Sequence, residues 1–133
     1  MTNEAKKVEL TNSTGFPRRY TCASGAAITK GTLLKLTDPR TAAASTAAFD
    51  PIAGIALMDK SITNDDSTSI TAWTDGVFEM VASGAIAIGM PVRSAGNNNY
   101  VSLNAGSASG AVTFGYTLEA ADDGETINVR LRL

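Results

Sequence analysis

The sequence contains no histidine and one cysteine among its 133 residues. A disulfide within the chain is therefore impossible, a zinc site lacks its usual ligands, and Ser-His or Cys-His nucleophile pairs cannot form. Cys22 fits a small buried side chain, with a reactive thiol as the alternative. We therefore predict a protein that is not an enzyme, with no catalytic residues, no cofactor and no metal.

Long apolar runs are also lacking. No segment approaches the roughly 20 apolar residues of a membrane span, and the N-terminus has no apolar stretch typical of a signal peptide. The net charge is only −2, so no strong field points to nucleic acid or to an anionic membrane. We expect neither as a partner, and we expect synthesis in a cytoplasm.

Acidic pairs are the remaining candidates for chemistry. Asp65-Asp66 and Asp122-Asp123 each precede a strand-like run, and paired carboxylates can bind calcium or act in catalysis. Both pairs lie in segments rich in Gly, Ser, Thr and Asn, where Asp is favoured by turn geometry. Neither has the spacing of an EF-hand loop. We interpret both as turns.

What the chain does contain is a repeat. Residues 23–36 read ASGAAITKGTLLKL, and residues 82–94 read ASGAIAIGMPVRS. A turn, a small-residue or apolar run, a strand with a central glycine (Gly54, Gly115) and a final strand follow in the same order in both halves. We predict two similar β units, at about 21–75 and 76–133, within one β domain at 21–133.

Strand periodicity supports an all-β fold. In the last strand Ile127, Val129, Leu131 and Leu133 alternate with polar residues, as in a half-buried antiparallel strand. The sequence predicts hairpins at 37–40 and at 95–99, and Asp75-Gly76 predicts a third. The Ala-rich run 41–48 is compatible with a helical turn but is too short to stand alone. We predict a compact barrel or sandwich with little helix.

Residues 1–20 differ from the rest in charge. They hold four of the 11 basic residues but only two of the 13 acidic ones. The stretch KKVELT alternates, so it can add as a strand to the sheet edge of a partner. We predict an extended N-terminal arm at 1–20 that is mobile in the free protein, so that deleting residues 2–15 leaves the fold intact. Its predicted partner-contacting residues are Lys6, Lys7, Val8, Leu10, Phe16, Arg18 and Arg19.

The repeat aligns Trp73 with Arg130. This places Trp73 on the polar face of its strand, where an aromatic side chain suits a subunit interface; a core position is the alternative. We predict a possible subunit interface at Trp73, Arg130 and Arg132.

The order of these motifs resembles the small head-decoration, or cement, proteins of tailed bacteriophages. The resemblance covers roughly residues 20–133 and rests on four stretches: ASGAAITKGTLLKL, DPIAGIALMD, GVFEMVASGAIAIGMPVRS and VTFGYTLEAADDGETINVRL. It implies a non-enzymatic structural virion protein, similar in role to the lambda-type decoration proteins. Those proteins sit as trimers on the outer capsid surface and lock neighbouring capsomers.

The function expected from this resemblance is binding to the outside of a phage capsid, with stabilisation of contacts between capsomers. The partner would be the major capsid protein, and the bound form a homotrimer. The alternative is a small β module that recognises glycans or another cell-surface ligand from a virion or fibre. Such modules usually display an aromatic platform, and the eight aromatic residues here are scattered along the chain.

Overall fold

The computed structural model describes residues 4–10, 17–22, 27–38, 40–59, 69–96, 99–103 and 112–132. In these residues the chain forms strands and no helix. The strands are β1 (Lys6–Glu9), β2 (Arg18–Thr21), β3 (Leu33–Asp38), β4 (Thr41–Ala44), β5 (Ile52–Ala56), β6 (Ser69–Trp73), β7 (Asp75–Ala82), β8 (Pro91–Ser94), β9 (Tyr100–Leu103), β10 (Gly115–Thr117) and β11 (Thr126–Arg132).

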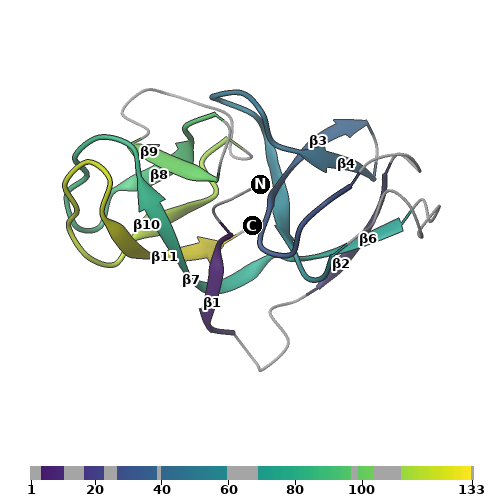
Figure 1. The fold of residues 1–133 in the computed structure, drawn as a ribbon, viewed down its shortest axis with the longest axis horizontal. Helices are drawn as coiled ribbons and strands as arrows, with labels where there is room; N and C mark the ends of the chain where they lie inside the picture. The colour runs from purple at the N-terminus through teal and green to yellow at the C-terminus, as the bar shows by residue number, and fades with distance from the viewer. Residues whose placement is uncertain are drawn as a thin grey trace.

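The strands close into two barrels of the same topology, which lie side by side in Figure 1. The first has the order β2-β4-β3-β5-β6, and the second the order β7-β9-β8-β10-β11. Pairing directions also agree, because β2–β4 and β7–β9 are parallel while the remaining pairs are antiparallel. The predicted all-β architecture of two similar units is confirmed, and both units are barrels.

Two of the predicted hairpins are present, one in each barrel. β3 pairs with β4 and β8 pairs with β9, both antiparallel. Arg40 and Asn99 end the two turns with positive φ angles of 55° and 60°, a left-handed conformation common in turns. Pro39, Asn97 and Asn98 lie outside the described residues. The Ala-rich run forms β4 rather than a helical turn.

The central glycines are required by close approach of two strands. A Cβ on Gly54 would collide with the carbonyl oxygen of Trp73 in β6, and a Cβ on Gly115 would collide with that of Arg130 in β11. The same close approach of two backbones occurs in both barrels and explains why a glycine recurs at this position. It also makes Trp73 and Arg130 equivalent residues of the two barrels.

Each barrel has its own apolar interior. The first is filled mainly by small side chains, and the second by larger ones, including Phe78 and Phe114. Cys22 is buried in the first interior, as predicted. In β11, Ile127, Val129 and Leu131 are buried in the predicted alternation, while Leu133 lies outside the described residues.

The two barrels are joined by a buried junction. Leu33, Ile52 and Ile55 of the first barrel belong to the hydrophobic cluster of the second. The side chain of Asn99 crosses the junction: its Oδ1 accepts a hydrogen bond from Leu33 N–H at 2.9 Å, and its Nδ2 donates to the Gly31 carbonyl at 3.3 Å. Packing and hydrogen bonding together hold the barrels as one block.

The Asp75-Gly76 hairpin prediction is wrong. β6 pairs with β2 and β5, whereas β7 pairs with β1, β9 and β11. Asp75 and Gly76 instead begin β7, where the chain passes from one barrel to the other. Gly76 is needed because a Cβ there would collide with the carbonyl oxygen of Glu9 in β1.

The N-terminal segment also differs from the expected mobile arm. β1 pairs antiparallel with β7 of the same chain, and β2 closes the first barrel by pairing with β6. Ala5 is buried, and its N–H donates to the Gly31 carbonyl at 2.8 Å. The alternation of KKVELT did predict a strand, but the sheet it joins is its own.

An acidic side chain fastens the loop between β4 and β5. The Asp50 carboxylate accepts hydrogen bonds from the N–H groups of Ala47 and Thr46 and from the Ser45 hydroxyl, at 2.9–3.1 Å. Burial raises the pKa of Asp50 by desolvation. These hydrogen bonds and the charge of Lys35 outweigh that effect, so the pKa of Asp50 lies below its ordinary value.

We expect Asp50→Asn to be less stable than the parent protein at pH 7 by about 1 kcal/mol. A lowered folded-state pKa stabilises the fold above the unfolded-state pKa, and this contribution disappears as pH falls through the folded value. The difference between the two proteins should therefore shrink below about pH 4. Urea unfolding from pH 7 to pH 2.5 measures it, and a difference independent of pH would contradict the assignment.

Candidate interaction surface

Trp73 lies at the junction of the barrels, as the last residue of β6. Its neighbour Ala72 points into the first barrel, so the Trp73 ring is on the outside of that barrel. The ring is half-buried and lies 5.4 Å from the ring of Phe78 in β7. Lys7 Nζ lies 5.8 Å from the Trp73 ring centroid, within cation–π range.

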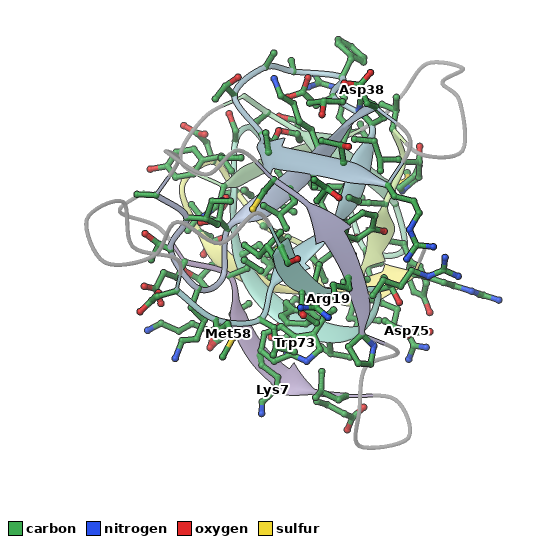
Figure 2. All side chains as sticks on the ribbon, turned by 90° about the vertical axis from the view of Figure 1, so that its right-hand side faces the viewer. Lys7, Arg19, Asp38, Met58, Trp73 and Asp75 are labelled. Carbon is green, nitrogen blue, oxygen red and sulfur yellow. The ribbon has the colours of Figure 1, made fainter. Side chains whose placement is uncertain are left out.

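Basic side chains surround this tryptophan. Lys6, Lys7 and Lys30 line a groove of about 360 Å³ together with Trp73, Ala5 and one carboxylate, that of Glu4. Next to it, β2 lies against β6, and Arg18 and Arg19 are opposite Ala72 and Thr71. Figure 2 shows Lys7, Trp73 and Arg19 near one end of the view, with Asp38 at the other.

A second groove, of about 300 Å³, lies along β2. Its lining is strongly basic: Pro17, Arg18, Arg19, Tyr20 and Arg40. Within the described parts of the chain, the one ion pair joins Arg130 and Asp75, so none of these basic groups is neutralised there by a carboxylate. We call the exposed basic residues of the two grooves the basic surface: Lys6, Lys7, Arg18, Arg19, Lys30 and Arg40.

The structure thus brings most of the predicted contact residues together. Lys6, Lys7, Arg18 and Arg19 are part of the basic surface. Val8 is 50% exposed, whereas Leu10 is half-buried and packs against the core. Phe16 lies outside the described residues. Lys30 and Arg40 were not predicted; their positions beside turns indicated exposure, but nothing in the sequence placed them near β1 and β2.

The other predicted interface residues lie apart from Trp73, on the second barrel. Arg130 is opposite Tyr116 and forms an ion pair with Asp75 at 2.7 Å. Arg132 lines a groove with Tyr116 and Pro91. Trp73 packs at the junction, and Arg130 is joined by its ion pair to Asp75, two residues after Trp73; a subunit interface at these residues stays a prediction.

Exposed apolar side chains gather beside these arginines. Gly89 N–H donates to the Thr117 carbonyl and Thr117 N–H donates to the Met90 carbonyl, which places residues 88–90 alongside 116–118. We call the four exposed apolar side chains of these two neighbouring segments the Tyr116 face: Ile88, Met90, Tyr116 and Leu118, which are 66%, 39%, 38% and 40% exposed. Periodicity did not reveal it, because apolar residues in a closed barrel are ordinarily assigned to the interior.

The acidic pairs show no metal-binding geometry where they are described. Asp122 and Asp123 lie in a turn, in which Asp122 N–H donates to Glu125 and Asp123 accepts a hydrogen bond from Gly84 N–H. Asp65 and Asp66 lie outside the described residues. Across the ranges that are described, no three His, Cys, Asp or Glu side chains are grouped as metal ligands, and no helix is long and apolar enough to cross a membrane.

A protein-family model described as phage cement protein matches residues 12–133. The chain belongs to the phage cement protein family. It is therefore a structural phage protein associated with the capsid, which confirms the resemblance found in the sequence.

A solved structure has a similar fold. The head fiber gp8.5 N base of bacteriophage phi29, known from a crystal structure, is 16% identical, with a TM-score of 0.53. The similarity covers 87% of this cement protein and 94% of that chain. At this identity it concerns the fold alone. No curated protein matches the sequence.

Proposed function

We propose that this cement protein binds the outside of the phage capsid through its basic surface and stabilises contacts between capsomers. The observation that carries the proposal is the grouping of exposed cations on β1, β2 and the adjoining turns of an otherwise acidic chain. A block of two barrels joined by a packed and hydrogen-bonded junction is suited to bridging two capsomers. The family match favours this function over glycan recognition.

The partner in this proposal is the major capsid protein, contacted at acidic groups. Exposed ion pairs contribute roughly 0–1 kcal/mol each and are screened by salt. Removal of four cations by Lys6→Ala, Lys7→Ala, Arg18→Ala and Arg19→Ala should therefore weaken capsid binding by about 2 kcal/mol, or about 30-fold. Occupancy of expanded capsids, measured by sedimentation over a range of protein and salt concentrations, tests this.

The control is Arg93→Ala, which removes a cation from β8 of the second barrel. We expect this variant to occupy capsids as the parent protein does. Occupancy that is unchanged in the fourfold variant and insensitive to salt would contradict binding through the basic surface. A melting curve of each variant separates lost binding from lost folding.

We further propose that bound copies form homotrimers through the Tyr116 face. In the first barrel, the residues equivalent to Pro91, Tyr116 and Arg130 are Leu33, Ile55 and Trp73. This row of the first barrel is covered by the second barrel and by β1. A second copy is the occupant that this internal arrangement suggests for the matching row at Pro91 and Tyr116. Arg130, the equivalent of Trp73, would then lie within the interface, and Arg132 at its rim.

A stable interface of this kind buries roughly 1,200–2,000 Å². Substituting Tyr116→Ser and Leu118→Ser should abolish three-copy clusters on decorated capsids, as seen by cryo-electron microscopy, while single copies still bind at high concentration. Clusters that persist in this variant, or parent protein bound only as isolated copies, would contradict the proposed trimer.

A further inference from the structure

The position of β1 shows how one barrel accepts an added strand. β1 lies antiparallel along an outer edge of β7, with Lys6 opposite Glu79 and Lys7 opposite Phe78. The other pairings of β7 close its own barrel. β1 is therefore a sixth strand attached to a complete five-strand barrel, and the Lys6–Glu79 position sets opposite charges across the pair.

The same edge exists on β2, the counterpart of β7 in the first barrel. Arg19 is opposite Thr71, and Glu79 is opposite Asn128. Thr71 and Asn128 each stand two residues before the equivalent pair Trp73 and Arg130. Arg19 therefore takes in the first barrel the place that Glu79 takes in the second.

Among the described residues, the outer edge of β2 is paired at one end only. β4 pairs with β2 only at Thr21, whose N–H donates to the Arg40 carbonyl at 2.7 Å. Backbone groups of a strand alternate between its two edges, so Arg19 directs its N–H and carbonyl to the same edge as Thr21, away from β6. Within the ranges that the structure describes, no strand pairs with this edge at 17–20.

The charge at this edge is the reverse of that on β7. Where β7 has Glu79 opposite a lysine, β2 has Arg19, and the groove beside it is lined by two further arginines, Arg18 and Arg40. A second copy of β1, with Lys6 and Lys7, would meet like charges there, which is unfavourable. An acidic strand would meet opposite charges.

We propose that the outer edge of β2 at Arg19 binds an acidic, extended segment of the capsid protein as an added antiparallel strand. Backbone hydrogen bonds to Arg19 fix the position of the segment, and carboxylates facing Arg18, Arg19 and Arg40 select it. Identifying the capsid protein as the source rests on the proposed function. The strand-binding property belongs to this chain and can be tested without a capsid.

Two capped peptides serve as probes. One is EAKKVEL, which is residues 4–10 of this chain, and the other is the same peptide with Lys6→Glu and Lys7→Glu. We expect the acidic peptide to bind at least about tenfold more tightly than the native one, because two cations opposite arginines are exchanged for two anions. Amide shifts in a ¹⁵N NMR titration should be largest at 18–20.

A charge reversal and a backbone modification make the test specific. In Arg19→Glu, which changes an exposed side chain, the preference should invert toward the native peptide. Methylating the peptide nitrogen that faces Arg19 should abolish binding by removing a backbone donor. Equal binding of both peptides, shifts located elsewhere, an unchanged preference in Arg19→Glu or full binding of the methylated peptide would each overturn strand addition.

The outcome is separable from the proposed function. If the cation-deficient protein loses capsid occupancy while neither peptide binds at β2, the capsid function stands and strand addition fails. If the acidic peptide binds at β2 while capsid occupancy is independent of the arginines, strand binding stands and its assignment to the capsid fails.

Discussion

Deleting residues 2–10 is expected to destabilise the free protein by about 2–4 kcal/mol. The deletion removes buried Ala5, the half-buried Leu10 and the hydrogen bond from Ala5 N–H to Gly31. It also exposes the edge of β7 that β1 covers and the space that β1 fills against Gly76. For a chain of this size the melting temperature should fall by roughly 10 °C.

Differential scanning calorimetry of the deleted and full-length proteins measures this effect. The control variant Lys6→Ala with Lys7→Ala keeps the strand and its backbone bonds, so it should change the melting temperature little. Adding the EAKKVEL peptide to the deleted protein should restore part of the loss by reoccupying β7. An unchanged melting temperature after deletion would instead support the mobile arm expected from the sequence.

The sequence predicted a mobile arm, whereas the structure has a strand paired within the chain. The two differ because alternation identifies a strand but not its partner. Lys7 and Glu9 on one side, with Val8 and Leu10 on the other, are as compatible with pairing inside the chain as with pairing to a capsid. The deciding feature is the uncovered edge of β7. That edge exists only after the second barrel has formed, so no local pattern contains it.

The division into two similar β units was predictable because the repeat preserves positions that geometry requires, whereas closure of each unit into its own barrel was not predicted. Gly54 and Gly115 recur since each lies against a carbonyl of the next strand. The Asp75-Gly76 error has the opposite origin. This pair has the composition of a tight hairpin turn, but it stands where the chain leaves one barrel for the other. Both edges of β6 are already paired, with β2 and β5, so β7 cannot pair with it.

The surfaces of the protein were harder to predict from the sequence than its cores. Arg18 and Arg19 were predicted from local charge, but their proximity to Lys7 depends on Trp73 and Phe78 meeting at the junction. The Tyr116 face was missed because apolar residues in strands are ordinarily assigned to the core. In the first barrel the residue equivalent to Tyr116 is Ile55, which is buried by the other barrel, and the sequence does not indicate which of the two positions is covered.

The role of Asn99 at the junction of the barrels was not predicted from the sequence. It ends an Asn-rich turn and was interpreted as turn chemistry alone, which its φ of 60° supports. Yet the side chain is 2% exposed and crosses the junction between the barrels. A polar side chain with both roles cannot be distinguished from an ordinary turn residue until the second barrel is placed.

We expect Asn99→Ala to lower the free energy of unfolding by about 3–4 kcal/mol. Leu33 N–H would lose its acceptor in a buried position, which costs about 1–3 kcal/mol. The Gly31 carbonyl would keep its hydrogen bond from Ala5 N–H, so its loss is smaller. Alanine at a left-handed position adds roughly 1–2 kcal/mol of backbone strain.

Asn99→Gly separates the two causes, because glycine adopts positive φ without strain but lacks the side chain. It should be more stable than Asn99→Ala by about 1 kcal/mol and still clearly less stable than the parent protein. Asn128→Ala, at a half-buried asparagine of β11, is the matched control and should change stability by less than about 1 kcal/mol. Guanidinium unfolding of the three variants gives these values. If Asn99→Gly is as stable as the parent protein, the junction does not depend on this side chain, and the two barrels are held together by the packing of Leu33, Ile52 and Ile55 alone.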